Sequence, residues 1–350
     1  MAEHQNIRWE HGYHRLRVAR IVQETGDTRS FVLDVPEELR GLFRYRPGQF
    51  CTFRVPVDGV AHLRSYSMSS APETDQHLTV TVKRVPGGVV SNWLNDTVAE
   101  DDVLEVTRPA GVFCARDGVF PVVAFCGGSG VTPVLSIVKS VLTGTRRAVR
   151  VFYANRDRES VIFAAELREL AERHLGRLEL RLHCDADSGY PTASDLTEFA
   201  MSTVDADFFV CGPGPFMALA EDALRALGVD EDSILIERFL DVGQPADPAS
   251  DEPGGTPPES VTIILNGKKS TVDYHDGDTI LETARRGGMQ PPFSCEAGNC
   301  ATCMAIIRDG SASMRENNAL TEDEVADGWV LTCQGIPQGP GEVTVEYEQF

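Results

Sequence analysis

The chain has 350 residues, which at roughly 150 residues per domain predicts two or three domains. Its 42% hydrophobic and 24% charged residues exclude a mainly disordered or fibrous protein. The 32 Lys and Arg against 53 Asp and Glu give a net charge of −21, which argues against nucleic acid and anionic membrane surfaces as partners and favours a basic partner. Because no run of about 18 apolar residues and no apolar signal core occur, we expect a cytoplasmic protein without membrane insertion.

The N-terminal third predicts a small antiparallel β-barrel over residues 12–112. Short β-rich runs are separated by turns, and one brief helix is expected near 91–97. The expected strands are 15–22, 28–35, 49–55, 63–70, 78–84 and 103–108.

Residues 113–240 predict an α/β domain with a doubly wound parallel sheet, because apolar strands alternate there with helical patterns. The expected strands are 122–126, 149–153, 178–183, 207–211 and 234–237, and the expected helices are 132–142, 163–174 and 215–227.

The segment 241–260 contains five prolines among glycines and acidic residues, so it cannot build a core and is expected to be a linker. After it, 261–265 and 269–274 predict a hairpin that turns at Asn266-Gly267, followed by a helix near 280–286. Residues 261–350 form the third expected domain, with a net charge of −8. That charge suits docking onto a basic partner.

Four cysteines near the C-terminus have the spacing C-x4-C-x2-C, with the fourth after 29 further residues. This spacing is typical of a plant-type [2Fe–2S] cluster, whereas a structural zinc site more often uses paired C-x2–4-C knuckles. The small side chains around Gly298 leave room for a loop to wrap closely around a cluster. The predicted ligands are Cys295, Cys300, Cys303 and Cys333.

Two motifs in the barrel predict a nucleotide cofactor. The first ends a strand, and its Arg can pair with a phosphate, its Tyr can stack on a ring and its Ser can bond a ring nitrogen. In the second, glycines allow close backbone approach and Ser91 is expected to cap a helix whose N-terminus favours an anion. The candidate residues are Arg64, Ser65, Tyr66, Ser67, Thr81, Val82, Lys83, Gly88, Val89, Val90 and Ser91.

Two strand-to-helix turns in the α/β domain predict a second nucleotide site, because ligands bind at the carboxyl ends of strands in such sheets. The first turn is glycine-rich but is not the G-x-G-x-x-G fingerprint, since its final position is Pro133. The candidate residues are Gly128, Ser129, Gly130, Thr132 and Pro133 in the first turn and Cys211, Gly212 and Pro213 in the second.

With these motifs in this order, the chain resembles a ferredoxin–NADP⁺ reductase-type flavoprotein with a plant-type ferredoxin domain at its C-terminus. Within that superfamily it is similar to reductase components of bacterial oxygenases, such as those of the 3-ketosteroid 9α-hydroxylase and phenylacetyl-CoA epoxidase systems. The resemblance covers residues 12–350 and includes the stretches Tyr153-Ala154-Asn155-Arg156 and Ser160-Val161-Ile162-Phe163.

The resemblance implies an FAD-binding barrel, an NAD(P)-binding α/β domain and a β-grasp-like [2Fe–2S] ferredoxin domain. Arg64, Tyr66 and Ser67 would hold the FAD phosphates, stack on the flavin and bond near its N5. Cys211, helped by Glu237, would lie beside the nicotinamide and the flavin N5.

The other site residues also take their roles from the resemblance. Residues 81–83 and 88–91 would hold the ribityl chain and pyrophosphate, and Ser129 and Thr132 would contact phosphates or the flavin. Asn155 and Arg156 belong to the nicotinamide nucleotide site. Phe239 matches the aromatic residue that covers the flavin in relatives whose chain ends there, whereas here the linker follows.

The implied activity is that of an NAD(P)H-dependent oxidoreductase that passes electrons from NADH through FAD and a [2Fe–2S] cluster to a terminal Rieske or di-iron oxygenase. Asp157 lies between Arg156 and Arg158 and would repel a 2′-phosphate, which favours NADH over NADPH. Two alternatives remain, namely a general diaphorase without a dedicated oxygenase and a redox binding module with a vestigial flavin site.

Overall fold

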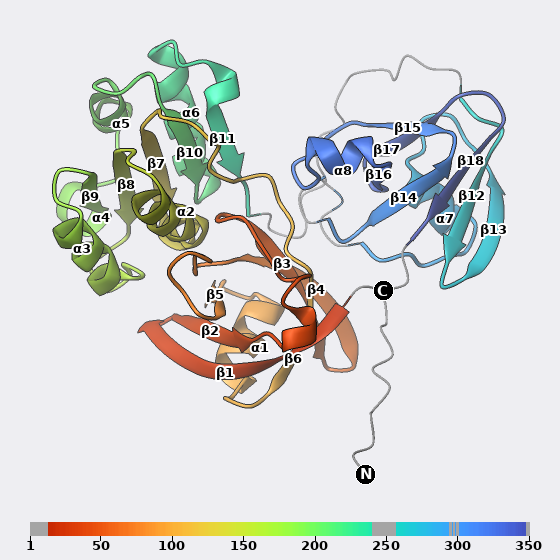
Figure 1. Cartoon of the computed structure of the whole chain (residues 1–350), viewed down its shortest axis with the longest axis horizontal. Helices are drawn as coiled ribbons and strands as arrows, with labels where there is room; N and C mark the ends of the chain where they lie inside the picture. Colours follow the sequence, from red (N-terminus) through yellow and green to blue (C-terminus); the bar gives the residue numbers. More distant parts are fainter. Residues whose placement is uncertain (1–12, 240–256, 294–295, 297, 299–300, 348–350) are drawn as a thin grey trace.

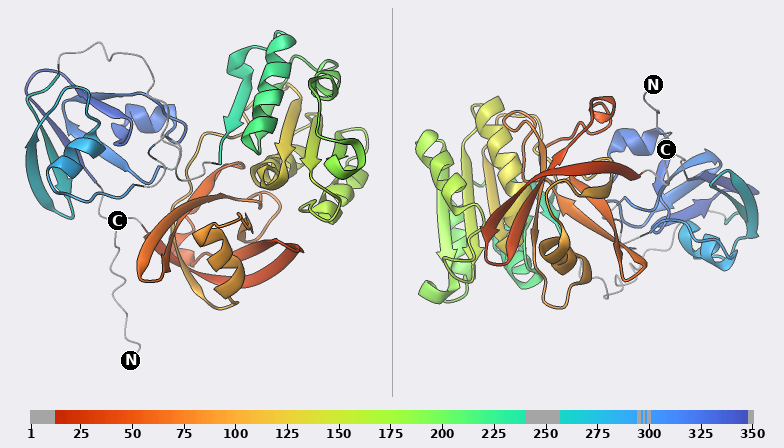
Figure 2. Two further views of the ribbon diagram at one scale, coloured as in Figure 1. Left: turned by 180° about the vertical axis from the view of Figure 1, so that it is seen from behind. Right: turned by 90° about the horizontal axis from the view of Figure 1, so that it is seen from below.

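The computed structural model describes residues 13–239, 257–293, 296, 298 and 301–347. The chain forms three modules, an N-terminal barrel, a central α/β module and a C-terminal mixed-sheet module, and the barrel contacts both of the others (Figures 1 and 2). This arrangement confirms the predicted fold class. Within the described residues, no helix combines the length and apolar character needed to cross a membrane.

The barrel is a six-stranded antiparallel sheet in the order β4-β3-β6-β1-β2-β5. A bridge between Met68 and Val80 brings its two edge strands together. The β3–β4 hairpin turns at Asp58 and Gly59, whose positive φ angles of 51° and 77° suit a tight hairpin turn. The elements are β1 (Tyr13–Thr25), β2 (Thr28–Asp34), β3 (Phe50–Val57), β4 (Val60–Ser67), β5 (Leu78–Lys83), α1 (Val89–Thr97) and β6 (Val103–Thr107).

The central module has a five-stranded parallel sheet in the order β11-β10-β7-β8-β9. Helices α2 and α3 pack on one face, and α5 and α6 pack on the other. The strands are β7 (Val122–Gly127), β8 (Val149–Asn155), β9 (Leu178–Cys184), β10 (Asp207–Cys211) and β11 (Ile234–Glu237). The helices are α2 (Val131–Gly144), α3 (Ala164–Arg173), α4 (Asp185–Ser188), α5 (Ala193–Ala200) and α6 (Gly214–Ala226).

The C-terminal module is a mixed sheet in the order β13-β12-β18-β14-β16, with α7 packed on it. Asn266 and Gly267 turn the first hairpin with φ angles of 53° and 71°, as predicted. The first elements are β12 (Ser260–Leu265), β13 (Lys268–Asp273), α7 (Ile280–Arg286) and β14 (Met304–Asp309). The later ones are β15 (Ser311–Met314), α8 (Glu322–Ala326), β16 (Trp329–Leu331), β17 (Gly335–Gln338) and β18 (Glu342–Glu346).

Helix α2 attaches the central module to the barrel. The Ser136 hydroxyl donates to the Ser70 carbonyl oxygen at 2.5 Å, and the Lys139 ammonium pairs with Asp75 at 2.7 Å. Because α2 begins at the end of β7, this attachment holds the carboxyl end of the parallel sheet against the barrel. The helix start and the barrel strands therefore face one another.

Candidate functional site

A cleft of about 560 Å³ lies where the barrel meets the start of α2. It brings together both barrel motifs, the first strand-to-helix turn and the last aromatic residue before the linker. The lining residues are Arg64, Ser65, Tyr66, Ser67, Thr81, Lys83, Val85, Pro86, Gly87, Gly88, Val89, Val90, Ser91, Ser129, Thr132 and Phe239.

Strand β4 supplies one wall of the cleft. The Tyr66 ring packs edge-on against Phe53 with 5.6 Å between ring centroids, and burial raises the pKa of its hydroxyl. The Arg64 guanidinium donates to the Leu63 carbonyl oxygen at 2.6 Å, and within the described residues no carboxylate pairs with it. Arg64 therefore keeps its charge available to a phosphate, and Tyr66 is held as a rigid surface for a planar ring.

Strand β5 and the start of α1 form the opposite wall. Gly88 is the N-cap residue of α1, and a Cβ added there would come within 2.7 Å of the Ser91 hydroxyl. Ser91 does not cap the helix as predicted, because its hydroxyl accepts a hydrogen bond from the Val85 amide at 3.1 Å and so closes the loop before α1. Val82 is buried in the barrel core, so only its backbone is available to a ligand.

The two strand-to-helix turns meet between β7 and β10, where the order of the parallel strands reverses. Gly130 packs so closely on the second turn that an added Cβ would lie 2.8 Å from the Gly212 nitrogen. The Thr132 hydroxyl donates to the Ser129 carbonyl oxygen at 2.9 Å and fixes the first turn. Pro133 is buried in the first turn of α2, and Pro213 is the N-cap residue of α6. This is the crevice in which open α/β sheets bind nucleotides.

Cys211 lies at the centre of this strand end, with Cys126 as its register partner on β7 and Glu237 on β11. Burial, the neighbouring Glu237 and Cys126 raise the pKa of the Cys211 thiol well above its ordinary value. Burial also raises the pKa of Glu237 to about 8. The strand end therefore holds a neutral thiol beside a carboxylic acid that is protonated at neutral pH. A protonated carboxyl can donate a hydrogen bond.

The end of β8 adds Asn155, which is buried and whose amide has no hydrogen-bond partner among the described residues. Arg156, next along the chain, pairs with Asp157 at 2.9 Å, and Arg158 pairs with Asp187 at 3.1 Å. The Asp157 carboxylate is fixed, because it also accepts a hydrogen bond from the Ser160 amide at 2.8 Å. An unsatisfied buried amide at a strand end fits a polar ligand.

Two of the four predicted cluster ligands lie in the described part of the C-terminal module. Cys303 is 2% exposed and Cys333 is 7% exposed. The Thr332 hydroxyl donates to the Cys303 carbonyl oxygen at 2.8 Å, which ties the two cysteine-bearing segments together. Cys295 and Cys300 lie outside the described residues. Two buried cysteines that share one apolar cluster suit the predicted ligation of an iron–sulfur cluster.

Residues beyond the cysteines support this loop, and of these only Gly298 was expected from the sequence, whereas Arg285, Glu296 and Gln334 were missed. Arg285 on α7 pairs with both carboxylate oxygens of Glu296 at 2.8 and 3.0 Å, and the Gln334 amide donates to the Glu296 carbonyl oxygen at 2.8 Å. Gly298 has a φ of +73°, and a Cβ there would lie 2.7 Å from the Glu316 carbonyl oxygen. The only sequence signal for Gln334 was its position directly after Cys333.

Three family models match the chain in the expected order. Residues 15–114 match an oxidoreductase FAD-binding domain, residues 125–222 an oxidoreductase NAD-binding domain, and residues 263–338 a 2Fe-2S iron-sulfur cluster binding domain. Each match coincides with one of the three modules. The chain is thus similar to proteins that hold FAD, a nicotinamide nucleotide and a [2Fe–2S] cluster.

Similar proteins of about the same length belong to oxygenase systems. The chain is 40% identical to the ferredoxin reductase component of 3-ketosteroid-9-alpha-monooxygenase from Rhodococcus rhodochrous, over 92% of this chain and 93% of the relative. It is 31% identical to one of the subunits of 1,2-phenylacetyl-CoA epoxidase from Escherichia coli, over 96% and 98%. The structure of phthalate dioxygenase reductase has the same fold, with a TM-score of 0.61 at 24% identity over 96% and 98% of the two chains.

Proposed function

The chain belongs to the family of FAD- and [2Fe–2S]-containing reductase components of oxygenases, and from this we propose that it passes electrons from NADH to a terminal oxygenase of the Rieske or di-iron type. The main support is that the cleft of the barrel opens beside Ser129 and Thr132 of the α/β module, while the cysteine-bearing module packs on the same barrel. In space the flavin site thus lies between the donor site and the cluster site. This arrangement suits a protein that receives two electrons together and releases them one at a time.

We assign 12–112 to FAD binding, 113–240 to the nicotinamide nucleotide, 241–260 to the linker and 261–350 to the cluster. Arg64 and Lys83, with the start of α1, would bind the FAD phosphates, and Tyr66 and Ser67 would contact the flavin ring. Phe239 is 42% exposed and lines this cleft, which supports a role in covering the flavin although the linker follows. FAD supplies two-electron acceptance and one-electron release when bound.

The chain's own residues would orient the nicotinamide donor. Gly128 leaves its turn open to a backbone-bound phosphate, Gly130 and Gly212 let the two strand ends pack closely together, and Asn155 supplies an unsatisfied amide. Cys211 is fully buried and is not among the residues that line the cleft, so its uncharged thiol would support the donor site from within the strand end, and the raised pKa of Glu237 beside it would limit negative charge where a hydride must approach. Ser67 would hold a hydrogen bond at the ring edge from the other side of the cleft.

Anaerobic titration of the purified holoprotein with NADH tests this function. We expect the flavin absorbance to bleach and the electron paramagnetic resonance signal of a reduced [2Fe–2S] cluster to develop with a total uptake of about three electrons per chain, because the flavin holds two and the cluster one. Bleaching without a cluster signal would contradict the path from flavin to cluster, whereas a reduced cluster that delivers no electrons to a terminal oxygenase would support the general diaphorase. A protein that binds no flavin would support the vestigial-flavin alternative.

The loop after β8 predicts a preference for NADH. The Asp157 carboxylate is held by the Ser160 amide and pairs with Arg156. Its negative charge therefore repels a 2′-phosphate, and it neutralises the arginine that would otherwise bind that phosphate. In the Asp157→Asn variant we expect kcat/KM for NADPH to rise about tenfold relative to NADH, equal to about 1.4 kcal/mol.

Asp222→Asn on α6 is the matched control, since it removes an exposed carboxylate that pairs with Arg225 at 3.2 Å. We expect no change in the donor ratio there. Steady-state kinetics with both donors decides the point, and a parent enzyme that prefers NADPH would contradict the assignment.

A further inference from the structure

The C-terminal module contacts the barrel through a small apolar patch centred on Phe50 of β3. Phe50 is 2% exposed and packs in one cluster with Leu320, Cys303 and Cys333. On the barrel side, Phe50 is the register partner of Ser67 on β4, a residue that lines the cleft. Phe50 thus belongs both to the strand pair that lines the cleft and to the apolar cluster that contains two cysteines of the C-terminal module.

The barrel segment that follows β6 carries the other contacts. The Gly111 amide donates to the Ala319 carbonyl oxygen at 3.2 Å, which is a backbone bond between the two modules. Gly111 has a φ of +115°, and a Cβ there would lie 2.9 Å from the Phe50 ring. The absence of a side chain at this position therefore lets the segment after β6 pack closely on Phe50 within the barrel, beside the contact with Ala319.

Arg108, three residues earlier, makes the charged contact. Its Nη2 atom lies 3.3 Å from the Glu324 Oε1 atom, and its guanidinium lies over the Trp329 ring at 5.5 Å from the centroid. Glu324 is held in place, because its other carboxylate oxygen accepts a hydrogen bond from the Thr321 amide at 2.9 Å at the start of α8. Arg108 thus contacts two groups of the C-terminal module, a carboxylate that is already held in place and an indole ring.

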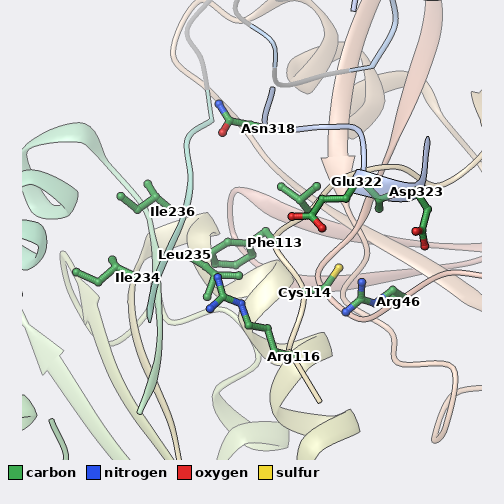
Figure 3. Close-up of a pocket in the computed structure, with 12 residues that line it drawn as sticks. Arg46, Phe113, Cys114, Arg116, Ile234, Leu235, Ile236, Asn318, Glu322 and Asp323 are labelled. Atoms are coloured by element: carbon green, nitrogen blue, oxygen red, sulfur yellow. The ribbon is translucent and has the colours of Figure 1, made fainter. Parts of the chain in front are cut away.

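Beside these contacts a groove of about 590 Å³ lies between the C-terminal module on one side and the barrel and the central module on the other (Figure 3). Arg46 and Arg116 line it from one side, and Glu322 and Asp323 of α8 line it from the other. In the described part of the chain no ion pair joins these four residues, and Arg46 instead donates to the Ala115 carbonyl oxygen at 3.1 Å. The opposite charges on its two sides attract the C-terminal module toward the rest of the chain at long range, but among the described residues they form no ion pair across the groove.

We propose that Arg108 is a positioning residue that holds the cluster module reversibly against the barrel for electron transfer from flavin to cluster. A small apolar patch and a single charged contact beside an open groove are features of a transient interface between domains. The inference rests on the proposed function. When bound, FAD would take up the two electrons of a hydride and release them one at a time, and the cluster would pass each electron to the external acceptor before it takes the next, while the proton passes to solvent.

The test uses the holoprotein with Arg108→Gln, Arg108→Lys, Glu324→Gln and the double Gln variant. Gln at position 324 keeps the capping interaction of α8, because Gln also serves at that position of a capping box. Arg308→Gln is the matched control, since Arg308 pairs with Glu346 at 2.7 Å within the same module, away from the contacts above.

The first readout is hydrogen exchange at the Gly111 amide, whose bond to Ala319 forms only when the modules are in contact. Loss of a part-buried ion pair and a cation–π contact should lower its protection about 3- to 30-fold in Arg108→Gln. The double variant should equal Arg108→Gln to within experimental error if Glu324 acts only through Arg108, and Arg308→Gln should match the parent.

The second readout is anaerobic stopped-flow mixing with NADH. Flavin bleaching should keep the parent rate in every variant, whereas the later cluster reduction should slow in Arg108→Gln and recover partly in Arg108→Lys. Raising ionic strength to about 0.15 M, where the Debye length is about 8 Å, should slow cluster reduction in the parent more than in Arg108→Gln.

The proposal would be overturned if the Gly111 amide in Arg108→Gln kept the protection that it has in the parent protein. It would also be overturned if that protection were lost while the cluster was still reduced at the parent rate. A parent protein whose cluster is never reduced by NADH would instead defeat the proposed function.

Discussion

Replacing Cys303 with Ser should abolish delivery of electrons to an oxygenase while leaving NADH oxidation intact. Cys303 is buried in the same apolar cluster as Cys333 and is tied to its segment through Thr332, so the substitution removes one of the four predicted ligand thiolates. The flavin and nicotinamide residues lie in other modules with their own cores. The variant should therefore stay yellow, lose the red-brown cluster absorbance and still reduce ferricyanide with NADH.

Cys184→Ser is the control, because Cys184 is a partly exposed thiol at the end of β9 and belongs to a different module. It should retain both the cluster absorbance and electron delivery. If Cys303→Ser supported substrate hydroxylation at the parent rate, electrons would leave from the flavin directly. If ferricyanide reduction collapsed while flavin was retained, the modules would not act independently.

Replacing Gly130 with Ala should slow flavin reduction by NADH about 100-fold, the cost typical of a displacement of about 1 Å at a reacting centre. The φ of Gly130 is −61°, so Ala fits the backbone there, and the effect comes from the added methyl group alone. That methyl group would overlap the carbonyl of Cys211 and the Gly212 nitrogen, which forces β10 and the start of α2 apart. Overpacking of this kind costs about 1–3 kcal/mol.

Gly144→Ala at the other end of α2 is the matched control, because nothing lies within 4 Å of a Cβ added there. Stopped-flow flavin bleaching with NADH compares the two variants, and the flavin content of each is measured first. Equal rates in Gly130→Ala and the parent would show that the close approach of the two strand ends does not position the donor.

The sequence alone predicted the features that depend on local spacing, and the matching family model confirms a 2Fe-2S domain although the individual ligands stay predictions. Cluster ligation requires cysteines at short fixed intervals, and the spacing of Cys295, Cys300 and Cys303 is visible without any structure. Strand and helix patterns likewise predicted the barrel, the doubly wound sheet and the hairpin at Asn266-Gly267. Helix α5 was missed because it is short and depends on a capping box between Thr192 and Asp195 rather than on a long apolar pattern.

Only the tertiary structure decided how distant groups meet. It brings Phe239 to the cleft of β4 and α1, leaves the Asn155 amide without a partner among the described residues, and uses Ser91 to close a loop rather than to cap α1. Arg108 and Glu324 are 216 positions apart in the chain, so no local pattern relates them. Such contacts depend on how the modules pack together, and packing between distant segments leaves no periodic signal in the sequence of either one.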